Sequence, residues 1–284
     1  MFNIRNYTIV AHRATWYIVY MTILTGLILG IVQGLTEFIP VSSSGHLILA
    51  HKFLGSVSSN DLSIDAVLQL ATVLAVLVYF WKDLWGLLMN FFRFVIRKPI
   101  EHKERTLLIS IIIGTIPALV LGLILEKYME SMFREAHFVA YALFLGSVLM
   151  YVAERFAKQN KELTIVKGFQ IGLYQCLALL SGVSRSGSTI SGGLLSGLSR
   201  EEATRFSFLL SFPIILGSGL KKLYDLIKMG NLVSLGLPLG VAFVAAFVVG
   251  MFAIHFLIKY LRQHKLTVFV WYRVALAVII VIFL

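Results

Sequence analysis

Long apolar stretches, separated by short basic connections, constrain the fold of this chain more than any other feature. A helix needs about 20 apolar residues to cross a bilayer, and somewhat fewer where the bilayer thins or flanking side chains reach its surface. The runs 66–80 and 235–256 lack the polar–apolar alternation of a membrane β-barrel. The pattern therefore predicts membrane-spanning helices, in the segments 64–81, 107–125, 138–153, 206–220, 235–258 and 268–284.

The composition agrees with an apolar solvent around much of the chain. Hydrophobic residues make up 58% of the 284 residues and charged residues only 14%, whereas soluble proteins carry roughly 25% charged residues. The net charge of +11 comes largely from Lys and Arg gathered in three connections, 93–105, 155–167 and 259–265. Such clusters mark cytoplasmic loops, so we expect anionic membrane lipids as the partner of these cations and no nucleic acid.

Two further regions, 17–50 and 168–198, are apolar but interrupted by Gly, Ser and Pro. If the three basic connections lie in the cytoplasm, the second region must leave and re-enter the membrane on the cytoplasmic side. We expect it to be a re-entrant hairpin, and we expect the same of the first region. Irregular backbone at membrane depth is tolerated where it is buried in protein or lines a cavity.

A shift of 142 positions relates the two interrupted regions to each other. With three spans between equivalent points, the halves have opposite orientations, as in inverted-repeat proteins whose broken helices meet near the bilayer midplane. We predict an all-α polytopic membrane protein with an inverted repeat, about six full spans and two re-entrant helical hairpins. It forms a single transmembrane domain, 1–284, with repeat halves 17–153 and 154–284. The shift superposes Gly30 on Gly172, Gln33 on Gln175, Leu35 on Leu177, Val41 on Val183, Ser42 on Ser184, Ser44 on Ser186 and Gly45 on Gly187.

The first polar segment, Gln33–His46, is typical of one helix ending and another beginning. Gln33 and Glu37 are four residues apart and share a helix face. Pro40 ends that helix, because proline disfavours helical backbone at the residue before it. The following run Ser42–Gly45 offers hydroxyls and backbone N–H groups at the start of the next helix, where anions bind. His46 lies in the first turn of that helix.

The second polar segment, Ser181–Thr189, repeats this design with Arg185 in the place of Ser43. Arginine offers a fork of donors that suits a phosphate. An uncompensated charge near the bilayer centre costs about 3 kcal/mol on insertion scales, which indicates either a function or mutual pairing. A purely structural Glu37–Arg185 ion pair that joins the hairpins is the alternative interpretation. The residues expected to bind substrate are Ser42, Ser44, Ser184, Ser186, Gly187 and Thr189.

These two segments resemble the signatures of the undecaprenyl-diphosphatase family, the bacitracin-resistance proteins. Gln33–His46 resembles the motif (Glu/Gln)-x-x-x-Glu followed by Pro-x-Ser-Ser-x-Gly-His, and Ser184–Thr189 resembles Pro-Gly-x-Ser-Arg-Ser-x-x-Thr. The resemblance implies hydrolysis of undecaprenyl diphosphate to undecaprenyl phosphate and phosphate, which recycles the lipid carrier for cell-wall synthesis. It also implies a bacterial plasma-membrane protein with its active site on the outer side. A homodimer is compatible with the sequence.

The resemblance assigns a role to each residue that matches a motif position. Glu37, Ser43, His46 and Arg185 take the catalytic positions, with Arg185 binding phosphate. We expect Glu37 and Gln33 to hold a divalent cation, Mg²⁺ or Ca²⁺, through oxygen ligands. We expect His46 to take a proton from Ser43 or from water.

Two positions depart from the family pattern. Gln33 stands where many members have Glu, which removes one formal charge from the metal site. Ser181 stands where the second motif usually begins with Pro, which loosens the constraint on the backbone before Arg185.

Two other functions fit parts of the pattern. A polyprenyl-phosphate flippase or transporter uses inverted repeats with meeting hairpins, and the same polar groups bind a head group without cleaving it. A type-2 phosphatidic acid phosphatase shares an element that resembles Ser44-Gly45-His46. That family requires a histidine six residues after the arginine of its Ser-Arg motif, and this chain has Ser191 there.

Overall fold

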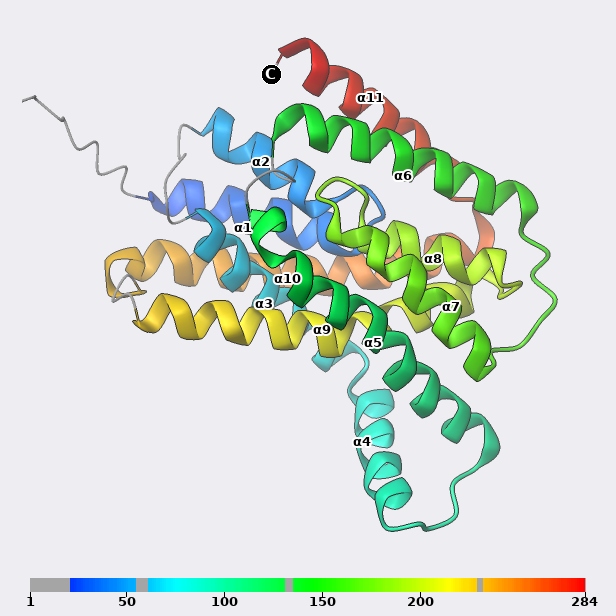
Figure 1. Cartoon of the computed structure of the whole chain (residues 1–284). Coiled ribbons are helices and arrows are strands. Elements are labelled where there is room, and N and C mark those ends of the chain that lie inside the picture. Colours follow the sequence, from blue (N-terminus) through cyan, green and yellow to red (C-terminus); the bar gives the residue numbers. More distant parts are fainter. Residues whose placement is uncertain (1–20, 55–60, 131–134, 229–231, 284) are drawn as a thin grey trace, which may run out of the picture.

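The computed structural model describes residues 21–54, 61–130, 135–228 and 232–283 (Figure 1), and these ranges are helical apart from short turns and contain no strand. The predicted all-α class is therefore confirmed for the described part of the chain. The helices are α1 (Ile23–Phe38), α2 (Ser43–Phe53), α3 (Asp61–Tyr79), α4 (Trp81–Val95), α5 (His102–Glu130), α6 (Ala136–Phe156), α7 (Ile165–Cys176), the 3₁₀ turn η2 (Leu177–Leu179), α8 (Arg185–Leu195), α9 (Arg200–Lys228), α10 (Leu232–Gln263) and α11 (Thr267–Phe283).

Four of the six expected spans are long, apolar helices in the structure, namely those in α5, α6, α9 and α10. The expected span 64–81 lies mainly in α3, which is bent by 83° from α4 at Phe80, so that the two helices form a broken span or a re-entrant loop. The last expected span forms α11, which has 17 residues and lies at the short end of the range that crosses a bilayer. The chain is thus a polytopic membrane protein, in which α4 (Trp81–Val95) follows the bend as a separate helix.

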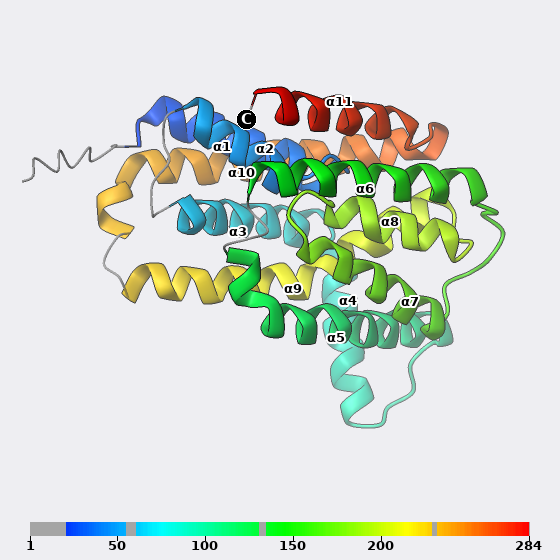
Figure 2. The same cartoon turned by 45° about the horizontal axis from the view of Figure 1, so that its top comes forward.

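Two pairs of short helices form the hairpins that the interrupted regions predict. The first, α1 and α2, breaks at Ile39–Ser42, where Pro40 disfavours helix. The second consists of α7, η2 and α8. Both views show the two hairpins entering from opposite ends of the bundle and meeting at their tips (Figures 1 and 2). The part of 17–50 before residue 21 lies outside the described residues.

Equivalent helices of the two halves pack in equivalent ways. Helix α1 runs along α10, and its counterpart α7 runs along α5. A Cβ atom at Gly30 would overlap the carbonyl oxygen of Ala242, and one at Gly172 would overlap that of Gly114. Glycine is therefore needed at both positions for close approach of the helix backbones. Each hairpin is packed against a helix of the other half, as an inverted repeat requires; the boundary between the halves stays a prediction.

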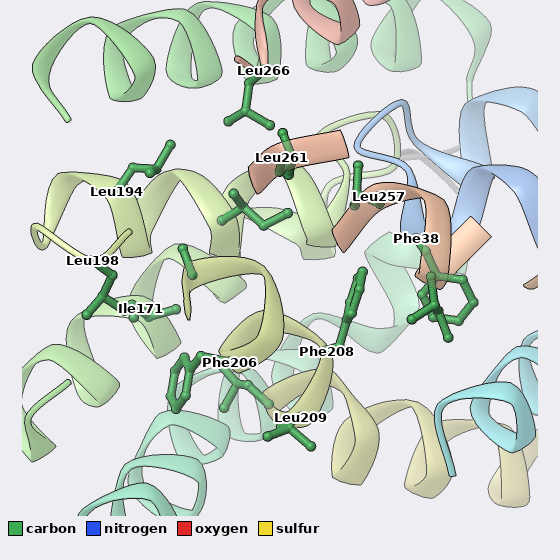
Figure 3. Close-up of a cluster of buried hydrophobic side chains, with 14 of the residues drawn as sticks. Phe38, Ile171, Leu194, Leu198, Phe206, Phe208, Leu209, Leu257, Leu261 and Leu266 are labelled. Atoms are coloured by element: carbon green, nitrogen blue, oxygen red, sulfur yellow. The ribbon is translucent and has the colours of Figure 1, made fainter. Parts of the chain in front are cut away.

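The largest apolar core surrounds the middle of α9 (Figure 3). Phe208 of α9 packs edge-to-face on Phe38 at the end of α1, with ring centroids 5.4 Å apart. Both rings are buried, and an edge-to-face aromatic pair contributes about 0.5–1.5 kcal/mol beyond burial of its surface. This contact fixes the last turn of α1, which carries Glu37, against α9.

The last residues of α6 and α10 and the start of α9 lie at the same end of the bundle (Figure 2), and ion pairs join them there. Arg200 binds Glu154, and Glu154 also accepts a hydrogen bond from the backbone N–H of Leu266. Arg262 pairs with Glu201 on the same end. The connections 155–167 and 259–265 lie there together, as their shared basic character predicts.

Candidate active site

The tips of the two hairpins have the same local geometry. Ser42 has φ 76° and ψ 99°, and Ser184 has φ 74° and ψ 117°. Positive φ is uncommon outside glycine and costs of order 1–3 kcal/mol, so it is found where surrounding contacts enforce it. Each serine side chain caps the following helix, Ser42 by accepting from the N–H of Gly45 and Ser184 from that of Gly187. The N-termini of α2 and α8 are therefore capped in the same way.

A buried ion pair joins the two hairpins. The Arg185 guanidinium contacts Glu37 Oε1, and the Glu37 side chain is only 1% exposed whereas that of Arg185 is 21% exposed. The other carboxylate oxygen accepts a hydrogen bond from Gln33 Nε2 at 3.0 Å and one from Ser43 Oγ at 2.8 Å. Four of the predicted site residues thus meet at one carboxylate. The pairing that the sequence offers as an alternative exists, and it lies within the predicted site.

His46 has different partners from those expected. Its Nδ1 lies 2.7 Å from the carbonyl oxygen of Ser42 and its Nε2 lies 2.7 Å from the hydroxyl of Tyr272. Since a carbonyl oxygen only accepts, Nδ1 carries the proton, and in the neutral ring the Tyr272 hydroxyl donates to Nε2. Among the described residues, Ser43 donates to Glu37 rather than to His46. The expected contact between His46 and Ser43 is therefore absent from this conformation, in which Ser43 lies beside Glu37.

The remaining predicted substrate-binding residues hold the two tips together. Ser44 Oγ accepts from the backbone N–H of Gly182 at 3.2 Å, which ties the first tip to the second. Ser184 and Ser186 exchange a hydrogen bond at 3.3 Å, matching the pair Ser42 and Ser44 at 3.2 Å. Thr189 points away toward α9 and bonds Ser207. The structure thus places Thr189 in support of α8, with its hydroxyl engaged.

A small cavity lies beside the ion pair. Its lining combines the charged pair with hydroxyls and rings of α9: Glu37, Phe38, Arg185, Ser186, Ser207, Phe208, Ser211 and Ile215. It has room for little more than one water molecule. The cavity as described is too small for a phosphate group.

The oxygen atoms around Glu37 fit a hard divalent cation. Ser43 Oγ and the Gln33 amide both lie within 3.0 Å of Glu37 Oε2, and Gln33 Oε1 is buried without a partner. Rotation of the amide presents that oxygen to the carboxylate. No group of three or more His, Cys, Asp or Glu side chains suited to a metal occurs in the described ranges. One carboxylate with neutral oxygens suits Mg²⁺, which binds through one or two carboxylates together with substrate phosphates and water, better than Ca²⁺, which takes six to eight ligands.

The amino-acid sequence matches one known protein family. The model of the family described as bacitracin resistance protein BacA matches residues 26–279, from the first turn of α1 to the last turn of α11. The chain belongs to the BacA family. This family is an undecaprenyl pyrophosphate phosphatase family, which indicates a hydrolase role in the membrane. Both polar tips lie inside the matched region, and so do all the described helices except the first residues of α1 and the last residues of α11.

The structure also brings two residues of α11 to the site that the sequence interpretation missed. Tyr272 bonds His46, and Arg273 is fully buried against both hairpin tips. Arg273 could have been found, because a charge within the apolar run 268–284 indicates a functional residue. Tyr272 gave no such signal, since tyrosine is common near membrane surfaces.

Proposed function

We propose that this member of the BacA family hydrolyses undecaprenyl diphosphate to undecaprenyl phosphate and inorganic phosphate, and so recycles the lipid carrier of cell-wall synthesis. One observation carries the proposal: residues 148 positions apart, Glu37 in the last turn of α1 and Arg185 in the first turn of α8, meet inside an apolar bundle. A carboxylate, a guanidinium, a serine hydroxyl and free helix N-termini are the groups that bind and cleave a phosphoanhydride.

Substrate binding begins with an exchange of partners at Arg185. The terminal phosphate replaces the Glu37 carboxylate on the guanidinium, because the fork of N–H groups fits either anion and the phosphate carries more charge. The N-terminal amides of α2 and α8 add donors from two sides. The apolar helix surfaces around the tips accept the prenyl tail. The exchange frees Glu37 from Arg185, and its carboxylate still faces the Ser43 hydroxyl.

Ser43 is the proposed nucleophile. Its hydroxyl donates to Glu37 Oε2 at 2.8 Å, which is the arrangement of a nucleophile beside its base. Ser43 Oγ attacks the terminal phosphorus while its proton passes to Glu37, and the bond from that phosphorus to the bridging oxygen breaks. Undecaprenyl phosphate leaves with the bridging oxygen. Water then attacks the phosphoserine while His46 takes a proton from that water. The bond from phosphorus to Ser43 Oγ breaks, Glu37 returns its proton to Ser43 Oγ, and phosphate is released with the Ser43 hydroxyl restored.

Arg185 stabilises the charge that builds on the transferred phosphoryl group during both steps. Glu37 and Gln33, with the phosphate oxygens, would hold Mg²⁺. When bound there, the cation supplies further neutralisation of phosphoryl charge. Residues of both hairpins are therefore needed in one reaction.

Phosphate release from undecaprenyl diphosphate by purified protein in detergent tests this function. We expect release with added Mg²⁺ and its loss with a chelator. The variants Glu37→Ala and Arg185→Ala should each lose at least about 100-fold in kcat, because the first removes the base that accepts the Ser43 proton and the second removes the cation that stabilises developing charge. The matched controls Glu201→Ala and Arg262→Ala break an exposed ion pair of the same chemistry and should leave kcat unchanged. Near-normal turnover by both site variants would refute the assignment.

A lipid-phosphate flippase is the second candidate, because the two hairpins enter from opposite ends of the bundle, which is a transporter design. Detergent separates the two functions, since nothing crosses a membrane there. Release of phosphate in detergent supports hydrolysis. Binding of the lipid without release supports transport.

A further inference from the structure

Arg273 of α11 is a buried charge that the proposed reaction does not use. Its side chain is 0% exposed, and among the described residues no carboxylate pairs with it. An unpaired cation in the interior of a membrane protein is costly and marks a residue with a function. The acceptors of its five N–H donors indicate which parts of the protein it contacts.

The guanidinium donates to four backbone carbonyls and one hydroxyl. Nε donates to Ser147 Oγ at 3.1 Å, and Nη2 donates to the carbonyl oxygen of Leu143 at 3.0 Å, both in α6. Nη2 also donates to the carbonyl oxygens of Gly182 at 3.0 Å and Val183 at 2.9 Å. Nη1 reaches the carbonyl oxygen of Pro40 at 3.4 Å. One guanidinium therefore bonds the tips of both hairpins.

The surroundings are shaped to admit this group. Gly146 of α6 faces the guanidinium, and a Cβ atom there would overlap Arg273 Nη2 and approach the Val183 carbonyl oxygen at 2.7 Å. Neither lysine nor any neutral side chain has enough donors in a planar fork to bond all these oxygens. This set of hydrogen bonds thus requires both Gly146 and Arg273.

The bonded carbonyls lie directly before the reacting groups. Pro40 precedes Ser43 by three residues, and Val183 precedes Arg185 by two. Both segments have strained serines, Ser42 and Ser184, that need such support. We propose that Arg273 is a positioning residue that fixes the separation of Ser43 and Arg185 by bonding both hairpin tips. The inference rests on the proposed function and extends it to a residue outside both motifs.

Kinetics of purified Arg273→Met and Arg273→Lys test the proposal. A misplacement of about 1 Å between reacting groups costs on the order of 100-fold in rate. We therefore expect Arg273→Met to lower kcat about 100-fold with KM within threefold of wild type, and Arg273→Lys to recover part of that loss. Arg262→Met, which removes an exposed arginine, is the control and should match wild type. Folded Arg273→Met with unchanged kcat would overturn the proposal.

Hydrogen exchange tests the same role without activity. In Arg273→Met we expect faster amide exchange in the segments 40–46 and 181–187 together, with no change in 200–210. A uniform increase, or an increase in neither tip, would overturn the proposal. If Arg273→Met does not fold, Gly146→Ala takes its place, because the added methyl group displaces the guanidinium while the charge stays. Faster amide exchange confined to the segments 40–46 and 181–187 in this variant then supports the role. If wild-type protein releases no phosphate, the proposed function fails, and exchange still decides whether Arg273 holds the tips.

Discussion

Removal of the Glu37 charge separates the structural from the catalytic role of the buried ion pair. In Glu37→Gln the amide oxygen still accepts from Gln33 and Ser43, but Arg185 loses its counter-ion. Removal of one partner of a buried pair costs about 3–5 kcal/mol. The guanidinium is 21% exposed, so water screens part of its charge and we expect the lower end, about 3 kcal/mol. That corresponds to a melting temperature lower by roughly 6–12 °C.

The exposed ion pair Glu201 and Arg262 shows how much smaller the change in melting temperature should be for a pair that water screens. Its side chains are 45% and 56% exposed, and exposed pairs contribute about 0–1 kcal/mol. Glu201→Gln should therefore lower the melting temperature by less than about 4 °C. Thermal unfolding in detergent, followed by tryptophan fluorescence, measures both variants under the same conditions. Equal shifts for Glu37→Gln and Glu201→Gln would refute the argument from burial.

The double variant Glu37→Gln/Arg185→Met tests whether the two charges depend on each other. It removes both charges, and replacement of a buried pair by uncharged groups is often neutral or stabilising, so most of the lost melting temperature should return. Turnover should stay at least about 100-fold below wild type, because the phosphate has lost its guanidinium. A double variant that regains both stability and turnover would show that the pair is only structural.

Three further predictions concern other parts of the structure. Tyr272→Phe removes the hydroxyl that donates to His46; loss of one hydrogen bond of about 1 kcal/mol should lower kcat about fivefold, and an unchanged kcat would show that His46 needs no such partner. Rapid acid quench of a single turnover should trap phosphoserine at Ser43, detected by mass spectrometry, and its repeated absence would favour direct attack by water. Gly30→Ala should destabilise the protein because the methyl group overlaps the α10 backbone, whereas Gly217→Ala, which meets nothing within 4 Å, should not; equal melting temperatures would contradict this packing.

The local features of the fold could be predicted from the sequence because they depend on nearby residues. Pro40 ends α1, and the serines at 42 and 184 cap the next helices, as residue type and spacing indicate. The bend at Phe80 could not be predicted, since neither proline nor glycine stands there and the turn depends on packing of α3 and α4 against other helices. The sequence interpretation therefore assigned 64–81 as a complete span.

The site could be predicted in its membership but not in its contacts. The motifs identify Glu37, Ser43, His46 and Arg185, whereas the bond of His46 to Tyr272 joins residues 226 positions apart. No local pattern encodes such a distance. The same is true of Arg273, whose partners are backbone carbonyls and therefore leave no trace in residue type.

The ion pair between the hairpins has a consequence for the order of events during synthesis. Glu37 enters the membrane 148 residues before Arg185, and α10, against which α1 packs, follows later still. Until then, the carboxylate lacks its counter-ion, at a cost of about 3 kcal/mol if it stays charged in the membrane, and the glycine face of α1 is uncovered. A half-made chain therefore has no working site, and the enzyme can begin to act only when its last helices are in place.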